Sequence, residues 1–288
     1  MFAITGATGA VGKRVAARLA AAGAQQRLVV RDPTRAPSLS GVEVSAPAEF
    51  ADRESMVRAF DGTDTVFLVS GREAANRVDE HRSAVDAAVR AGVSRIVYLS
   101  FQGAAEFCTF TFGRDHWHTE QYIRDSGLEF TFLRDSLYLG AVVSFVGDDG
   151  VIRGPAGDGR VAAVARDDVA DVAASILVDG DTSGRTYDVT GPDAISLAEA
   201  AQIIGRACGR DITYHDETIE EAYASRAQYA AEEFEVTGWV SSYQAIAAGE
   251  LSKVSETVER ITGHAPMGLP EYLTRHPASI SRLLPRFG

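Results

Sequence analysis

Short apolar runs alternate with amphipathic stretches along the first half of the chain. In the amphipathic stretches, apolar residues recur every three or four positions, as on one face of a helix. A continuous apolar run, such as residues 66–69, is typical of a strand covered on both faces. The runs lie at residues 2–4, 27–30, 42–44, 66–70, 96–100 and 130–134, and the helical patterns at 11–19, 52–60, 81–91 and 116–125. This alternation predicts an α/β fold, a Rossmann-like doubly wound parallel sheet with helices on both faces.

The rhythm changes after residue 134. The expected elements are a loop or hairpin in the Gly- and Asp-rich residues 147–160, a helix at 167–178, a strand at 186–189, and helices opened by capping boxes at 196–199 and 218–221. We therefore expect an NAD(P)-binding domain in residues 1–135, to which 165–189 return. Residues 136–164 and 190–288 are expected to form a smaller, mostly helical substrate or lid domain.

Three glycines mark the turn between the first strand and the first helix. Gly6, Gly9 and Gly12 follow the run at 2–4 in the spacing G-x-x-G-x-x-G, which differs from the commoner G-x-G-x-x-G. Gly6 permits a sharp turn, Gly9 leaves room for a phosphate, and Gly12 lets helix and strand pack closely. The helix N-terminus offers free N–H groups and a partial positive charge. The pattern predicts pyrophosphate binding, with a flexible loop as the alternative.

Polar residues follow several of the predicted strands. In a parallel sheet the carboxyl ends meet at one edge, where ligands bind, so Thr5, Arg31, Ser70 and Ser100 are expected there. An Arg after the second strand favours a ribose 2′-phosphate, hence NADP(H) over NAD(H). The alternative is an exposed loop arginine paired with Asp32, and the acidic Asp32 leaves NAD(H) possible.

Composition narrows the function further. The chain has 288 residues, a formal net charge of −12 and 45% hydrophobic residues, enough to bury a large core. The acidic balance argues against nucleic acid as a partner. Cys108 and Cys208 are too few for a disulfide framework or a zinc site, and the histidines lack ligand spacing, so no metal is expected. With no leader before the first strand and no bilayer-length apolar stretch, we expect a cytoplasmic protein.

The chain resembles the NmrA-like atypical short-chain dehydrogenases, within them the subgroup of NADPH:quinone oxidoreductase type 2 and triphenylmethane reductase. The similar segments are ITGATGAVG, VVRDPTRA, HWHTEQYIRDSGLEFTFLRDSLY and GPAGDGRVAAVARDDVA. The resemblance implies that Arg31 binds the 2′-phosphate, and it places Glu49 where the family has an adenine-pocket Asp. It also implies that the pyrophosphate is held by Gly6, Thr8, Gly9, Ala10, Val11 and Gly12.

The usual catalytic pair of short-chain dehydrogenases is missing. These enzymes use Tyr-x-x-x-Lys, in which the lysine lowers the pKa of the phenol. Here the corresponding helix reads WHTEQ at 117–121, and no tyrosine lies four residues before a lysine. Alcohol–ketone interconversion is therefore not expected. A quinone or a cationic dye delocalises the incoming charge itself and needs alignment over the nicotinamide more than a tuned acid.

Two residues are candidates for polar groups near the nicotinamide. His116 stands where the family often has histidine, with a helix-start histidine bonded to backbone as the alternative. Tyr138 can contact the substrate or simply pack. Arg134 and residues 166–168 are expected to form structural ion pairs. A flat aromatic pocket is possible, lined by Phe107, Phe110, Phe112 and Trp117.

Three functions remain open. The first is an NADPH-dependent reductase of a quinone or similar conjugated electrophile, whose partner is a small aromatic or quinone-like molecule. The second is a redox-sensing regulator that binds NAD(P) without turnover and signals to a protein partner. The third is a biosynthetic reductase of a polyketide-like or phenolic substrate.

Overall fold

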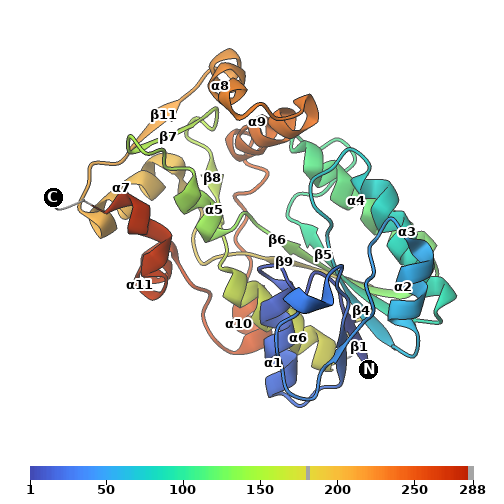
Figure 1. Cartoon of the computed structure of the whole chain (residues 1–288). Helices are drawn as coiled ribbons and strands as arrows, with labels where there is room; N and C mark the ends of the chain where they lie inside the picture. Colours follow the sequence, from blue (N-terminus) through green and yellow to red (C-terminus); the bar gives the residue numbers. More distant parts are fainter. Residues whose placement is uncertain (180–181, 285–288) are drawn as a thin grey trace.

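The computed structural model describes residues 1–179 and 182–284. Its centre is a seven-stranded sheet of order β3-β2-β1-β4-β5-β6-β9, in which every neighbouring pair is parallel (Figure 1). The strands are β1 (Phe2–Ile4), β2 (Gln26–Leu28), β3 (Glu43–Val44), β4 (Thr65–Val69), β5 (Arg95–Phe101), β6 (Glu129–Asp135) and β9 (Arg185–Val189). The parallel α/β sheet predicted from the apolar runs is confirmed.

Helices cover both faces of this sheet. Along β4, Val66 and Leu68 pack in one hydrophobic cluster with three helices, whereas Phe67 packs on the opposite face with two others. The first layer contains α2 (Arg53–Phe60), α3 (Arg77–Arg90) and α4 (Thr111–Asp125), and the second α1 (Gly12–Ala21) and α6 (Arg166–Asp179), joined by α10 (Thr257–Thr262). Successive strand residues alternate between the faces, which gives the doubly wound arrangement.

The strand order reverses between β1 and β4. The chain leaves β1 toward β2 and β3 on one side and then crosses back to β4 on the other. Ligands of open α/β sheets bind in the crevice outside the carboxyl ends of the strands at such a reversal. The glycine turn after β1 lies at this point.

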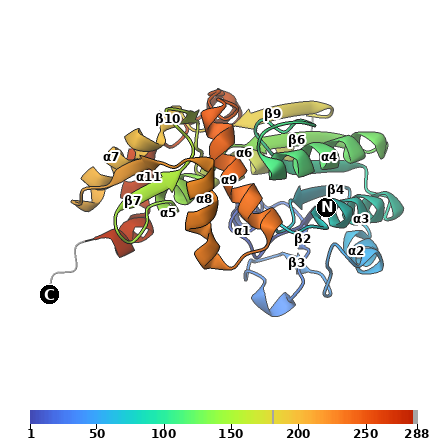
Figure 2. The ribbon, with the colours of Figure 1, turned by 90° about the horizontal axis from the view of Figure 1, so that it is seen from above.

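The remaining elements gather beside the sheet, away from α2 and α3 (Figures 1 and 2). They are α5 (Leu139–Ser144), β7 (Val151–Gly154), β8 (Arg160–Val161), β10 (Ile195–Ser196), α7 (Leu197–Cys208), β11 (Thr213–Asp216), α8 (Ile219–Arg226), α9 (Glu233–Ala247) and α11 (Leu269–Arg275), with 3-10 helices η2 (Ala227–Tyr229) and η3 (Pro277–Leu283). A third 3-10 helix, η1 (Pro33–Arg35), follows β2. Most of the elements beside the sheet pack in one hydrophobic cluster, which includes Val142, Ile204 and Ile246 and reaches Phe101 of β5 and Phe112 of α4.

Residues 147–160 form mostly turns and loop, as expected, but they also contain β7 and the first residue of β8. β7 pairs in parallel with β11, and β8 pairs antiparallel with β10, so both strands find partners later in the chain. An isolated antiparallel bridge between Val146 and Ile152 closes the turn locally. Local composition identified the turn, but pairing across many residues decided the strands.

Most predicted helix termini are confirmed. Ser196 and Thr218 each form a complete capping box, and Asp52 caps α2 by accepting the Ser55 N–H at 3.1 Å. Gly23 ends α1 with a φ of +71°. The helix expected at 116–125 instead begins at Thr111. His116 therefore lies in the second turn of this helix and not at its start.

We propose the domain division expected from the sequence for the described residues. β9 completes the sheet and α6 lies in its helical layer, although both follow α5 in the chain. The elements of 136–164 and 190–284 form the second unit, with α10 packed against α6. The last four residues of the expected second domain lie outside the described ranges. No helix within those ranges is long and apolar enough to cross a bilayer.

Candidate cofactor-binding site

The turn between β1 and α1 is shaped by its glycines. Gly6 has a φ of +60°, a left-handed conformation that residues with a Cβ seldom adopt. A Cβ atom on Gly12 would lie 2.3 Å from the carbonyl oxygen of Gly6, so a side chain there would push the turn open. The Gly9 N–H donates to the same Gly6 oxygen at 2.8 Å. The close approach that requires Gly12 is therefore to the turn itself, rather than to the strand as expected.

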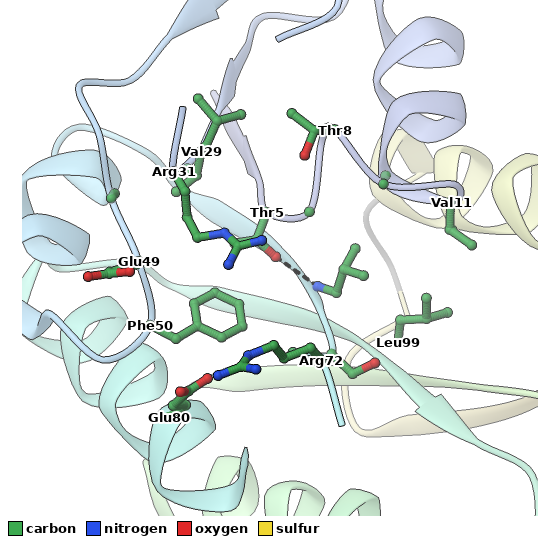
Figure 3. A pocket seen from close by; sticks show the side chains of 18 of the residues that line it. Thr5, Thr8, Val11, Val29, Arg31, Glu49, Phe50, Arg72, Glu80 and Leu99 are labelled. Atoms are coloured by element: carbon green, nitrogen blue, oxygen red, sulfur yellow. Dashed lines mark hydrogen bonds between the residues drawn. The ribbon is translucent and has the colours of Figure 1, made fainter. Parts of the chain in front are cut away.

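Thr5 joins the ends of β1 and β4 at the strand reversal. Its buried hydroxyl donates to the Phe67 carbonyl at 3.1 Å. It also accepts from the Val69 N–H at 2.8 Å, the bond drawn as a dashed line in Figure 3. Thr5 also lines the cavity described next. The side chain thus aligns the two strands on either side of the crevice.

A cavity of about 480 Å³ opens at the carboxyl edge of the sheet (Figure 3). Eight of the nine residues expected to bind the cofactor line it, and so do Glu49 and Tyr138. The eight are Gly6, Thr8, Gly9, Ala10, Val11, Gly12, Arg31 and Ser70. Free N–H groups at the start of α1 therefore face a space that can receive a pyrophosphate.

One end of the cavity lies beyond β2 and carries a free guanidinium. The side chain of Arg31 points into the cavity toward Phe50, and Glu49 lies nearby (Figure 3). Within residues 1–179 and 182–284, Arg31 has no ion-pair partner, because Asp32 caps η1 by accepting from the N–H and hydroxyl of Thr34 at 3.0 and 2.6 Å. The expected alternative, an Arg31–Asp32 pair, is therefore not formed. A guanidinium in this position suits a phosphate.

Two buried side chains hold the loop after β4, which lines the middle of the cavity. The Gly71 N–H donates to Nε2 of His81 at 2.8 Å, and Nε of Arg77 donates to the Gly71 carbonyl at 3.1 Å. His81 is fully buried, and this burial, with the charge of Arg77, lowers its pKa to about 3. A neutral imidazole accepts from Gly71 and donates through Nδ1 to Thr119 at 2.8 Å. The sequence analysis missed both residues, since nothing in their spacing indicates contact with the loop.

His116 does not reach the cavity. It lies 6% exposed in the second turn of α4, where Nδ1 is 2.9 Å from the Tyr98 hydroxyl and Nε2 accepts from Arg77 at 3.2 Å. Burial, then the charge of Arg77, holds its pKa well below the ordinary value. Because α4 begins at Thr111, this position faces β5 rather than the sheet edge. It does not match the alternative either, since its partners are side chains and not backbone.

Ser100 is also withdrawn from the cavity. It is completely buried, and its hydroxyl donates to Oε1 of Glu120 at 2.6 Å. Glu120 is itself fully buried and accepts two hydrogen bonds from Arg134, at 2.8 and 2.6 Å. The structural ion pair expected of Arg134 is confirmed, and the hydroxyl of Ser100 is used to satisfy its carboxylate.

The other end of the cavity lies beyond β5 and β6 and holds Leu99, Tyr138 and Arg166. The Tyr138 hydroxyl is hydrogen-bonded to Oδ2 of Asp135, and the Arg166 guanidinium lies 4.0 Å from the centre of the Tyr138 ring. Arg166 was expected in an ion pair, but within the described ranges none is formed within 4 Å. Asp167, by contrast, pairs with Arg14 at 3.0 Å, as expected.

Asp135 is the functional candidate that the sequence analysis missed. Its burial, opposed by the Tyr138 hydrogen bond and the Arg166 charge, raises the pKa of its carboxyl to about 7. The sequence contains a signal for Asp135 near the ligand-binding edge of the sheet. Asp135 directly follows the predicted strand 130–134, just as Arg31 follows the second strand. Its partner Tyr138 has a pKa well above the ordinary value, through burial and the neighbouring Asp135 charge.

The expected aromatic pocket does not form in this cavity. Phe107 is 85% exposed, whereas Phe110 and Phe112 are buried in the cluster beside the sheet. Trp117 is half-buried on α4, and none of these four rings lines the cavity. Packing against α9, where a Cβ on Gly238 would lie 2.2 Å from the Phe112 ring, explains the position of Phe112.

One group in the described ranges has metal-ligand geometry. Asp168, Asp171 and His264 each bring a ligand atom within 4.8 Å of the others. Their oxygens already have partners, since Asp168 accepts the Met267 N–H at 2.7 Å and Asp171 pairs with Arg18. The arrangement serves to fasten the segment after α10 to α6, and we assign no metal to it.

The parallel sheet, its strand reversal and the glycine turn beside a cavity of about 480 Å³ define a dinucleotide-binding protein of the Rossmann type. Comparison of the sequence with protein families identifies the family within this class. The chain belongs to the NmrA-like family, whose sequence pattern matches residues 1–273. The resemblance expected from the motifs is confirmed.

Three similar proteins span nearly the whole chain. A (4-alkanoyl-5-oxo-2,5-dihydrofuran-3-yl)methyl phosphate reductase of Streptomyces griseus is 35% identical over 286 residues, covering 96% of this chain and 98% of the relative. The NADPH complex of quinone oxidoreductase QOR2 from Escherichia coli superposes with a TM-score of 0.86 at 28% identity, covering 96% and 99% of the two chains. The NADP(H) complex of Citrobacter sp. triphenylmethane reductase gives 0.82 at 29% identity, covering 95% and 99%.

Proposed function

We propose that this protein transfers hydride from NADPH to an acceptor whose carbon–carbon double bond is conjugated to a carbonyl group, as in a quinone. The chain is an NAD(P)H-dependent oxidoreductase, and its cofactor is NADP(H), as expected from the sequence. The proposal rests on two residues at opposite ends of the cavity. Arg31 lies at one end and, among the described residues, has no ion-pair partner, and Tyr138 lies at the other end.

The placement of these two residues orients the cofactor. A 2′-phosphate on Arg31 and a pyrophosphate at the start of α1 direct the rest of an extended dinucleotide along the edge toward β5 and β6. The nicotinamide ring then lies near Leu99 and Tyr138. When bound, NADPH supplies the hydride, and the protein's part is to hold the acceptor against that ring.

The acceptor class follows from what the site lacks and from its relatives. Within the described ranges, no Tyr-x-x-x-Lys pair accompanies the cavity, so the acceptor must stabilise its own charge after hydride addition. The name of the Streptomyces griseus relative describes a ring double bond conjugated to two carbonyl groups, and quinones share that feature. The third expectation, a biosynthetic reductase, is compatible with the same chemistry.

We do not propose the second expected function, a redox-sensing regulator that binds NAD(P) without turnover. The three relatives compared above are each named as a reductase or oxidoreductase. A sensor also requires unequal affinity for oxidised and reduced cofactor.

The proposal is tested by steady-state oxidation of NADPH with benzoquinone, naphthoquinone, a 2-acylbutenolide and a triarylmethane dye. We expect turnover with the quinones or the butenolide. No turnover above a protein-free blank across this panel would remove the proposal, and unequal binding of NADP⁺ and NADPH would then favour the sensor.

Substitution of Arg31 tests how the cofactor is selected. Arg31→Glu replaces a phosphate partner by a like charge, so we expect NADPH affinity to fall by about 10- to 100-fold, in line with about 1.5–3 kcal/mol for a charged hydrogen bond. NADH affinity should change by less than about threefold. Arg35→Glu is the matched control, since Arg35 lies on η1 and does not line the cavity. An unchanged preference for NADPH in Arg31→Glu would show that this residue does not contact the 2′-phosphate.

A further inference from the structure

Asp135 and Tyr138 form a proton-carrying pair at the acceptor end of the cavity. Asp135 is the last residue of β6, and Tyr138 is the residue before α5. The tyrosine lines the cavity, while the carboxyl lies behind it, only 4% exposed and hydrogen-bonded to the phenol. A tyrosine on the cavity wall is therefore hydrogen-bonded to an acid that solvent scarcely reaches.

Reduction of a conjugated acceptor needs a proton as well as a hydride. The acceptor gains a hydride, and so two electrons, from the reduced nicotinamide, which becomes oxidised. An enolate or phenolate anion remains, and it must take up a proton to give the neutral product. Resting on the reductase function proposed above, we propose that Tyr138 donates this proton and that Asp135 replaces it.

Three proton transfers connect the product anion to solvent through Tyr138 and Asp135. The anion takes the proton of Tyr138 Oη as that O–H bond breaks. At rest the Tyr138 hydroxyl donates to Oδ2 of Asp135. Once the phenol has lost its proton, this bond reverses, and the tyrosine oxygen takes the proton of the Asp135 carboxyl. The Asp135 carboxylate then takes a proton from water. Tyr138 is the catalytic residue of this step, and Asp135 acts through it.

The surroundings of Asp135 keep its proton available. Its neighbours in register are Phe101 on β5 and Val189 on β9, both buried and apolar. The charged group that faces it from the packed elements is Arg166 of α6. With its pKa raised to about 7 by burial, the carboxyl still holds a proton in much of the protein at neutral pH.

Arg166 stabilises the ionised form of Tyr138. Its guanidinium lies over the Tyr138 ring at 4.0 Å, where a positive charge favours the phenolate that forms after proton donation. An ionised Asp135 disfavours that phenolate. Tyr138 therefore gives up its proton more readily while Asp135 is protonated, which links the two groups.

The test uses Tyr138→Phe, Asp135→Asn and a matched control, Tyr122→Phe. Tyr122 of α4 also forms a Tyr–Asp hydrogen bond, at 2.6 Å to Asp86 of α3, but it does not line the cavity. For the wild type we expect kcat with a 2-acylbutenolide to fall as pH rises through about 7, with a solvent deuterium isotope effect. Tyr138→Phe should lower kcat by about 100-fold or more, with the KM for NADPH within about twofold.

Asp135→Asn keeps the hydrogen-bonding shape but cannot exchange a proton. We expect a lower kcat whose fall near pH 7 has disappeared, whereas Tyr122→Phe should match the wild type. A wild-type pH profile in Asp135→Asn, or full kcat in Tyr138→Phe, overturns the pair while leaving the reductase function standing.

Infrared titration of the protein without cofactor tests the pair independently of turnover. The wild type should show a protonated-carboxyl band that disappears as pH rises through about 7, and Asp135→Asn should lack it. If no acceptor is reduced, the proposed function fails, and this band still decides whether Asp135 holds a proton. Absence of the band from the wild type overturns the pair whatever the kinetics show.

Discussion

Asp135→Asn should change how the stability of the protein depends on pH. Asp135 is 4% exposed, and its carboxyl has a pKa of about 7 against an ordinary value of 3.8, chiefly because burial disfavours the charged form. Asparagine has nearly the same shape and retains a hydrogen bond to Tyr138, but it does not titrate. The comparison therefore isolates the contribution of one buried proton to folding.

The direction follows from proton binding. Below pH 3.8 the carboxyl is protonated in both the folded and unfolded chains, so its stabilising contribution is complete. Between pH 3.8 and about 7 the folded chain keeps a proton that the unfolded chain has lost, so raising the pH favours unfolding. The two pKa values are about 3 pH units apart, which corresponds to about 4 kcal/mol at about 1.4 kcal/mol per unit.

Urea unfolding at pH 4.5, 6, 7 and 8 measures this effect. Because the series begins at pH 4.5, we expect the free energy of unfolding of Asp135→Asn, minus that of the wild type, to rise by about 3 kcal/mol across it. Other titrating groups cancel in the difference. Asp193→Asn controls for removal of an exposed carboxyl and should give a flat difference. A flat difference for Asp135→Asn as well would refute the assignment of a buried, proton-holding carboxyl.

Two further substitutions test the cavity and the core. Gly12→Ala places a Cβ 2.3 Å from the Gly6 carbonyl oxygen, so NADPH affinity measured by fluorescence titration should fall at least about tenfold; unchanged affinity would show that the turn can widen without loss. Glu120→Gln removes the buried charge that pairs with Arg134, and urea unfolding should show a loss of about 3 kcal/mol, whereas a loss below about 0.5 kcal/mol would mean that solvent reaches the guanidinium.

The strands and the glycine turn could be predicted because their causes are local. Continuous apolar runs such as 66–69 report burial on both faces, and left-handed glycines such as Gly6 and Gly23 report a backbone conformation that other residues avoid. Capping boxes need only four residues, and the box at Ser196 formed as expected. Each of these signals depends on neighbours within one turn of chain.

The positions of the candidate polar groups could not be predicted in the same way. His116 and Ser100 were both expected near the cofactor, but a helix that starts five residues early and a carboxylate 20 residues away drew them into the core. The partners of His116 are Arg77 and Tyr98, which lie 39 and 18 residues before it in the sequence.

The amino-acid sequence by itself determined the alternation of strands and helices in the main sheet, the glycine turn after β1 and the arginine that follows β2. The tertiary structure alone decided which polar groups face the cavity and which are buried beneath it. It also paired β7 with β11 and gave Asp135 its apolar neighbours on β5 and β9. The reason is physical: backbone conformation follows from adjacent residues, whereas the solvation and partners of a side chain depend on the segments that pack around it.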